Sequence, residues 1–149
     1  MLYHIETDER TAGGHTGTMY TLSCANIGSL IEVWPGFGFN CLRWRVHGHD
    51  LLFAADDWAA NPLPTRSGIP ILFPFPNRIR NGVFVHKGRE YRLPKNDSTQ
   101  ANAIHGFSPR TPWRVFGYGV DTTGAWAEID FNTPLATRLA KDWSYLGIG

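Results

Sequence analysis

The sequence predicts an all-β protein built as an antiparallel β-sandwich. Short runs rich in β-branched and aromatic residues alternate apolar with polar positions, and turn residues separate these runs at short intervals. The pattern indicates one short helix, at residues 133–140, where Thr133 can cap the helix and Pro134 occupies its first position. Many short strands at such spacing are typical of an antiparallel sandwich or barrel.

The first half of the chain carries three predicted strands. Residues 20–24 and 29–34 read as strands on either side of a turn at residues 25–28. Residues 39–46 alternate between a mostly apolar and a mostly polar set of side chains with a period of two, which indicates a strand in a half-buried sheet. A turn at residues 47–50 then leads into a further short extended run at residues 51–53.

Two hairpins are predicted in the second half. Residues 83–85 and 91–93 flank a turn at Lys87-Gly88. Residues 113–118 and 126–131 flank Asp121-Thr122-Thr123-Gly124, which is a strong turn signal between two β-rich runs.

Composition and charge limit the possible functions. The chain has 149 residues, of which 42% are hydrophobic and 13% aromatic, so it can form one domain with a hydrophobic core. A net charge of +1 with scattered basic residues argues against nucleic acid or a membrane surface as partner. No leader-like start and no membrane-length apolar run are visible, so we expect a cytoplasmic protein. Cys24 and Cys41 fit no metal or disulfide pattern and are interpreted as small buried residues.

The most informative stretch lies between residues 68 and 107. It begins Gly-Ile-Pro-Ile-Leu-Phe-Pro-Phe-Pro-Asn-Arg-Ile and ends Asn-Ala-Ile-His-Gly-Phe. Because Pro70, Pro74 and Pro76 have no N–H to donate to a sheet, this segment is expected to be an irregular, rigid connection. Such a connection can aim side chains at a ligand.

The residues of this stretch suit a sugar. A hexose presents hydroxyl groups that favour charged or bidentate donors, and C–H faces that favour aromatic rings. The stretch offers Asn77, Arg78, His105, Phe73, Phe75 and Phe107. Taken singly, each is more often a core or surface residue than a ligand-binding one, so the hypothesis depends on their joint occurrence.

These two motifs, in this order, resemble those of the aldose 1-epimerase (galactose mutarotase) family. The resemblance implies a β-supersandwich fold and interconversion of the α and β anomers of a hexose such as galactose or glucose, without a cofactor or a metal. It implies that Arg78, with Asn77 beside it, binds the sugar. It also implies that His105 is a binding and catalytic residue, with Phe107 in the same site.

The family's reaction needs an acid for the ring oxygen and a base for the C1 hydroxyl. In the family a second His and a Glu near the C-terminus serve these roles, and neither has a counterpart in these 149 residues. Family members are roughly twice as long. Residues 1–149 are therefore expected to be a single domain that is the N-terminal part of a longer mutarotase-like domain, and to be inactive in isolation.

Several alternatives stay open at this stage. A hexose-6-phosphate 1-epimerase would share the fold, and Arg43, Arg80 or Arg110 could meet its phosphate, although Asn77-Arg78-Ile79 favours a neutral hexose. A non-catalytic carbohydrate-binding sandwich is the third hypothesis. The His47-Gly48-His49 sequence could present two imidazoles to a metal, but a turn explains it better because no third ligand follows. The oligomeric state is not predicted.

Overall fold

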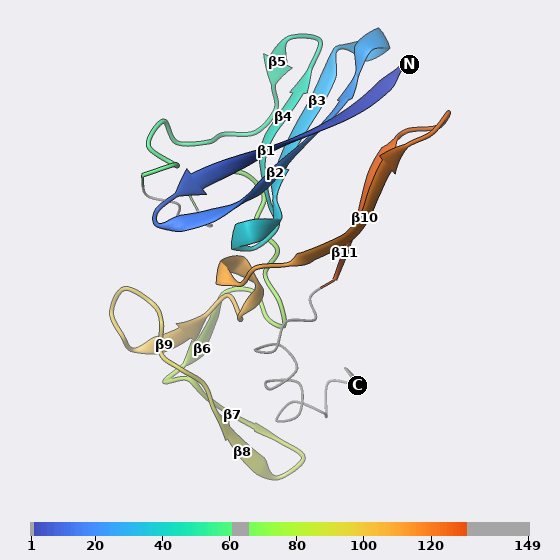
Figure 1. Ribbon diagram of the computed structural model, residues 1–149. Coiled ribbons are helices and arrows are strands. Elements are labelled where there is room, and N and C mark those ends of the chain that lie inside the picture. Colours follow the sequence, from blue (N-terminus) through green and yellow to red (C-terminus); the bar gives the residue numbers. More distant parts are fainter. Residues whose placement is uncertain (1, 61–65, 131–149) are drawn as a thin grey trace.

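The computed structural model describes residues 2–60 and 66–130. This part of the chain is almost entirely β-structure with antiparallel pairing, as predicted, and it contains three single-turn 3₁₀ helices (Figure 1). The strands are β1 (Tyr3–Ala12), β2 (His15–Cys24), β3 (Ser29–Trp34), β4 (Asn40–Val46), β5 (His49–Asp50), β6 (Arg78–Arg80), β7 (Val83–His86), β8 (Arg89–Arg92), β9 (Asn102–Ile104), β10 (Arg114–Val120) and β11 (Ala125–Asp130). The 3₁₀ helices are η1 (Ala25–Ile27), η2 (Pro35–Phe37) and η3 (Ser108–Arg110).

The largest sheet is a five-stranded antiparallel meander in the order β1-β2-β3-β4-β5. Its tight turns use residues with positive φ, as two-residue hairpins require. Gly13 and Gly14 have φ of 55° and 79° between β1 and β2, and His47 and Gly48 have φ of 49° and 80° between β4 and β5. His47 is therefore explained by the turn, and the second histidine of the His-x-His sequence begins β5.

The main core lies at one end of this sheet. Met19 of β2 and Trp34 of β3 are essentially inaccessible to solvent, and Phe37 of η2 packs against them. The hairpin β10–β11 lies alongside the sheet (Figure 1), where Tyr118 makes an edge contact with Tyr20 at 5.2 Å between ring centroids. This hairpin supplies part of the second layer expected of a sandwich.

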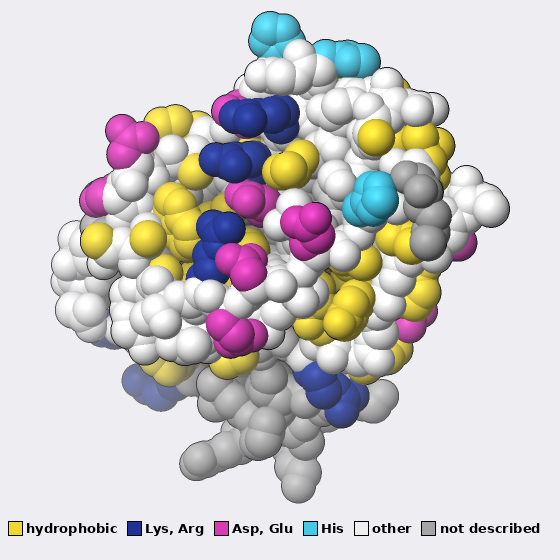
Figure 2. Space-filling model, turned by 45° about the horizontal axis from the view of Figure 1, so that its top comes forward, with side chains coloured by type: hydrophobic (Ala, Val, Ile, Leu, Met, Phe, Trp, Pro, Cys, Tyr) yellow, Lys and Arg dark blue, Asp and Glu magenta, His cyan; other side chains and the backbone are white. Residues whose placement is uncertain are grey.

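Charged side chains lie on β3, β4 and β5 of the same sheet. Arg45 pairs with Asp50 at 2.8 Å, and Glu32 lies 3.6 Å from Arg43. In the face shown in Figure 2, basic and acidic side chains lie next to one another. Arg43, one of the cations considered for a phosphate, is thus engaged in a surface ion pair on the five-stranded sheet.

Two short ribbons, β6–β9 and β7–β8, lie at the far end of the molecule from the large sheet (Figure 1). They share a small core in which Leu93 and Ala103 are buried, and the rings of Phe75, Phe84 and Phe107 pack against it. This small core fixes the elements that carry the second motif of the sequence.

The structure confirms the predicted hairpins and the irregular proline segment, which forms only isolated bridges at Ile69 and Phe73. Three details differ. The hairpin β1–β2 was not predicted beyond residues 20–24, residues 51–53 form no strand, and the two cysteines are half-buried rather than buried. The helix predicted at residues 133–140 lies outside the described residues. Within the described ranges, no helix has the length and apolarity needed to cross a membrane.

Candidate functional site

Hydrogen bonds hold the proline segment, residues 70–76, against η3. They do so although three residues of the segment are prolines with no N–H to donate. The N–H groups of Phe107 and Ser108 donate to the carbonyl of Phe73 at 2.8 and 3.2 Å. The hydroxyl oxygen of Ser108, which is fully buried, accepts the N–H of Phe73 at 2.8 Å. A segment that cannot join a sheet is thereby fixed at one point next to the His-Gly-Phe motif.

Gly106 permits this close approach. Its φ is +68°, and a Cβ placed there would lie 2.1 Å from the carbonyl oxygen of Phe73 and 2.7 Å from the nitrogen of Pro74. Only glycine avoids both the strained backbone and the overlap. The Gly of the second motif is therefore a structural requirement for bringing the two motifs together.

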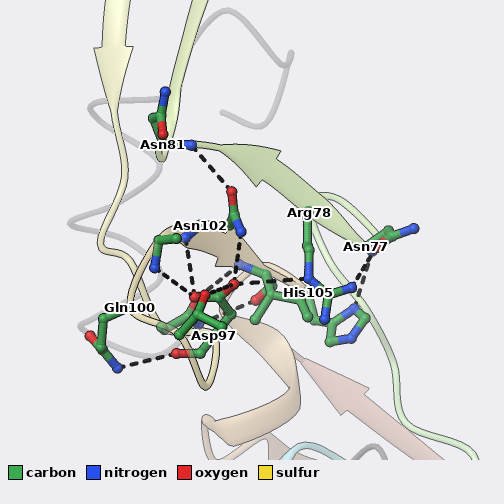
Figure 3. A network of polar contacts seen from close by, with 11 residues as sticks. Asn77, Arg78, Asn81, Asp97, Gln100, Asn102 and His105 are labelled. Atoms are coloured by element: carbon green, nitrogen blue, oxygen red, sulfur yellow. Dashed lines mark hydrogen bonds and ion pairs between the residues drawn. The ribbon is translucent and has the colours of Figure 1, made fainter.

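The strand pair β6–β9 sets the register of the two motifs. Arg78 pairs with Ile104 and Arg80 with Asn102, so that Asn77 and His105 leave the ribbon at the same end. The N–H of His105 donates to the carbonyl of Asn77 at 2.9 Å, and the N–H of Asn77 donates to Nδ1 of His105 at 3.1 Å (Figure 3). The imidazole is thus locked to the backbone of the first motif.

This bonding assigns the tautomer of His105. Since Nδ1 accepts a hydrogen bond it carries no proton, and a neutral ring must carry its proton on Nε2. Burial, reinforced by the positive charges of Arg78 and Arg110, lowers the pKa of His105 below its usual value of 6.5. At neutral pH the ring is therefore uncharged and offers one Nε2–H donor.

Asp97 organises the loop that faces His105. Its carboxylate is buried and accepts hydrogen bonds from the N–H groups of Ala101 and Asn102, from the Asn102 amide and from the Thr99 hydroxyl. These bonds, the one from the Asn102 side chain foremost, lower the pKa of Asp97 to about 2. The carboxylate is ionised and lies 3.9 Å from Nε of Arg78.

Arg78 extends from the start of β6 between Asp97 and the pair Asn77–His105 (Figure 3). Its Nη1 donates to Oδ1 of Asn77 at 3.3 Å, and its Nε faces the Asp97 carboxylate. The side chain still exposes 55% of its surface. The guanidinium is therefore oriented from two sides and keeps N–H donors for a ligand.

These groups border a depression of about 720 Å³. Its lining includes Arg78, His105 and Phe107, whose ring makes an edge contact with Phe75 at 6.4 Å. Asn77 does not line the depression and instead supports Arg78 and His105 from behind. Phe73, Phe75 and Arg80 are not part of the lining either.

Sequence reasoning missed two charged residues of this depression. Asp97 lies in Asn96-Asp97-Ser98-Thr99, a turn-type sequence that could have indicated a side chain capping its own loop. Arg66 also lines the depression, and no local pattern pointed to it. Arg110 lines it as well, as the phosphate hypothesis allowed. Within residues 2–60 and 66–130, no three His, Cys, Asp or Glu side chains gather in a way that could hold a metal ion.

A family model described as aldose 1-epimerase matches residues 33–123, which include every residue named in this site. A shorter similarity connects the chain to the uncharacterized protein YihR of Escherichia coli (strain K12), with 42% identity over 45 residues, or 30% of this chain and 15% of YihR.

Solved structures support the same fold. A galactose mutarotase-like protein from Clostridium acetobutylicum superimposes with a TM-score of 0.71 at 24% identity, over 92% of this chain and 41% of that one. A galactose 1-epimerase from Lactobacillus acidophilus NCFM superimposes with a TM-score of 0.56 at 18% identity, over 80% of this chain and 35% of that one. The chain thus spans less than half the length of the solved structures that it matches.

Proposed function

The chain belongs to the aldose 1-epimerase family, and from this premise we propose that its depression binds an aldose and takes part in the interconversion of the α and β anomers. One observation carries the proposal: a guanidinium, a neutral imidazole and an aromatic ring border the same depression. These are the groups that sugar hydroxyls and a C–H face require.

Each of the three groups has a distinct role in the proposal. Arg78 donates to sugar hydroxyls, and its two supports reduce the conformational freedom lost on binding. Phe107 packs against the C–H face of the ring. His105 presents Nε2–H to a sugar oxygen, since its Nδ1 is already occupied by the backbone of Asn77.

Ring opening moves two protons. The ring oxygen gains a proton while the C1 hydroxyl loses one, the C1–O5 bond breaks, and rotation about C1–C2 followed by reclosure gives the other anomer. His105 Nε2–H can stabilise the charge that develops on a sugar oxygen.

Asp97 does not suit the role of base. Its pKa of about 2 makes it a weak proton acceptor at neutral pH, and both of its oxygens already accept hydrogen bonds. It is also the one carboxylate lining the depression among the described residues. The proposal therefore assigns the base to a residue outside this lining.

Polarimetry of α-D-galactose and α-D-glucose tests the proposal, with the buffer-catalysed rate subtracted. We expect the 149-residue chain to bind the sugar weakly and to accelerate anomerisation little, because a missing acid and base together cost on the order of 10⁴-fold or more. Sugar binding is followed separately by saturation-transfer NMR.

Three outcomes would change the assignment. Lack of binding of any aldose, neutral or charged, by the folded chain would refute a sugar site. Rapid anomerisation by the chain that is lost in His105→Ala would show that residues 1–149 already contain the acid and the base. Binding without anomerisation in any longer form of the protein would instead favour a non-catalytic carbohydrate-binding sandwich.

A further inference from the structure

The charges around the depression are unbalanced. Three arginines line it, Arg66, Arg78 and Arg110, against the single carboxylate of Asp97 among the described residues. That carboxylate is buried and lies near Arg78 alone of the three. Neither Arg66 nor Arg110 forms an ion pair with any carboxylate that the structure describes. Among the described residues, no ion pair therefore compensates the charges of Arg66 and Arg110 at the depression.

The three arginines come from separate parts of the fold. Arg78 begins β6, Arg110 ends η3, and Arg66 directly precedes Ser67. Ser67 is buried and fixed, because its carbonyl accepts the Asn40 amide at 2.8 Å and its hydroxyl accepts the N–H of Ala55 at 2.9 Å. The backbone beside Arg66 is thus held in place, as are the β6 and η3 segments that carry the other two.

The positive charges of two of these arginines also affect the imidazole of His105. Burial is the main cause of the lowered pKa of His105, and the charges of Arg78 and Arg110 lower it further. Like charges gathered in this way repel one another, and an anion bound among them removes that cost. A neutral hexose would leave the repulsion in place.

We propose that the sugar bound in this depression carries an oxyanion, such as a carboxylate, phosphate or sulfonate, and that Arg66 and Arg110 bind that group while Arg78 and His105 bind the sugar ring. This inference rests on the proposed function, since it uses the same depression. The planar guanidinium donates two parallel N–H groups, which match the two oxygens of an oxyanion.

The test compares a neutral with an anionic sugar on the full chain. Calorimetry or NMR titration measures the affinity for glucose, glucose 6-phosphate and glucuronate, with inorganic phosphate as a probe of the anion group alone. At about 20 mM salt we expect the anionic sugars to bind at least about tenfold more tightly than glucose, and the ratio to fall at about 200 mM salt because of screening.

Substitutions of single arginines test which side chains cause the preference for the anionic sugar. Arg66→Gln and Arg110→Gln should each reduce the ratio of the affinity for the anionic sugar to the affinity for glucose. Arg110→Lys should retain part of the preference, because lysine keeps the positive charge but lacks the two parallel N–H donors of the guanidinium. Arg92→Gln, on the exposed surface of β8 away from the depression, is the matched control and should change nothing. All these side chains are exposed, so thermal melting should show folded variants.

The outcomes separate this inference from the proposed function. Equal affinity for glucose and the anionic sugars, unaffected by Arg66→Gln and Arg110→Gln, would overturn the inference while the sugar site stands. Binding of inorganic phosphate as tight as that of glucose 6-phosphate, with no binding of glucose or glucuronate, would overturn both, because the depression would then hold an anion without its sugar.

Discussion

Asn77 and His105 exchange two hydrogen bonds: the N–H of His105 donates to the Asn77 carbonyl at 2.9 Å, and the N–H of Asn77 donates to His105 Nδ1 at 3.1 Å. The second of these bonds uses a backbone donor to occupy one ring nitrogen. It leaves Nε2–H as the only donor of the neutral ring, and it joins the two motifs at the border of the depression.

Replacing His105 with Ala should reduce kcat/KM for anomerisation by about 10²–10⁴-fold in a form of the protein that has the activity, because the Nε2–H donor is lost. His49→Ala is the matched control, since His49 is an exposed histidine in β5. Polarimetry gives the rates, and thermal melting verifies the fold. A His105 variant that unfolds, yet is fully active in its folded fraction, would make His105 a structural residue.

The pKa of His105 should lie below 6.5 and should rise toward 6.5 in Arg110→Gln, because one of the charges that lowers it is removed. NMR titration of the imidazole resonances measures both values, and Arg92→Gln should leave the pKa unchanged. An unaltered pKa in Arg110→Gln would contradict the electrostatic contact between the two side chains.

The same pKa shift predicts a dependence of stability on pH. Since the pKa is lower in the folded than in the unfolded state, unfolding takes up a proton between the folded value and 6.5. The free energy of unfolding should therefore fall as the pH is lowered through this window and should be insensitive to His105 above it. In urea denaturation, the slope of the free energy of unfolding against pH should differ between wild type and His105→Gln only in that window.

Arg78→Ala should weaken sugar binding by about 10- to 100-fold, because hydrogen bonds from a charged donor are among the stronger ones. Arg80→Ala is a close control, since Arg80 is also an exposed arginine of β6 and does not line the depression. Saturation-transfer NMR or calorimetry measures both. Equal losses in the two variants would indicate a general effect of charge instead of a contact with the sugar.

Most of the fold could be predicted from local patterns, because turn residues and period-two alternation act over a few residues. The hairpin at Lys87-Gly88 is an example, with both residues at positive φ. The strand expected at residues 51–53 failed because β5 ends at Asp50 and the carbonyl of Phe53 is used by the N–H of Gly68 instead. Such a long-range bond leaves no local signal.

The site could be predicted only in part for a similar reason. Arg78 and His105 were identified by their motifs, and both border the depression. Arg66 carries no motif and reaches the depression because Ser67 anchors the adjacent backbone. Asp97 acts on its own loop, so its contribution depends on the conformation of residues 96–102, which the sequence alone does not fix.

Asp97→Asn should destabilise the protein strongly and also weaken sugar binding. An amide has only one acceptor oxygen, so two of the four donors around position 97 lose their partner, and Arg78 loses the negative charge 3.9 Å from its Nε. Asp121→Asn is the comparison, because Asp121 accepts local hydrogen bonds in an exposed turn. Urea midpoints should fall more for Asp97→Asn than for Asp121→Asn.

Stability of the wild type should also depend on Asp97 in acid. Its pKa is lowered to about 2 from 3.8, so folding favours the ionised form, and the resulting stabilisation is present above pH 3.8 and lost as the pH falls toward 2. In Asp97→Asn this loss should be absent. An identical acid dependence in both proteins would contradict the bonding of the carboxylate.

Gly106→Ala should be more damaging than Gly88→Ala, although both glycines have positive φ, +68° and +76°. At Gly88 an added Cβ meets no atom within 4 Å, so the cost is the backbone strain alone, about 1–2 kcal/mol. At Gly106 the Cβ would also overlap the carbonyl oxygen of Phe73 at 2.1 Å, so the proline segment must move, and we expect a loss above about 3 kcal/mol. Urea denaturation measures both free energies. We expect this movement to separate Asn77 from His105. Any folded Gly106→Ala protein should therefore also lose sugar binding, whereas Gly88→Ala should keep it. Equal stability and equal binding in the two variants would show that the contact between Gly106 and Phe73 does not hold the site together.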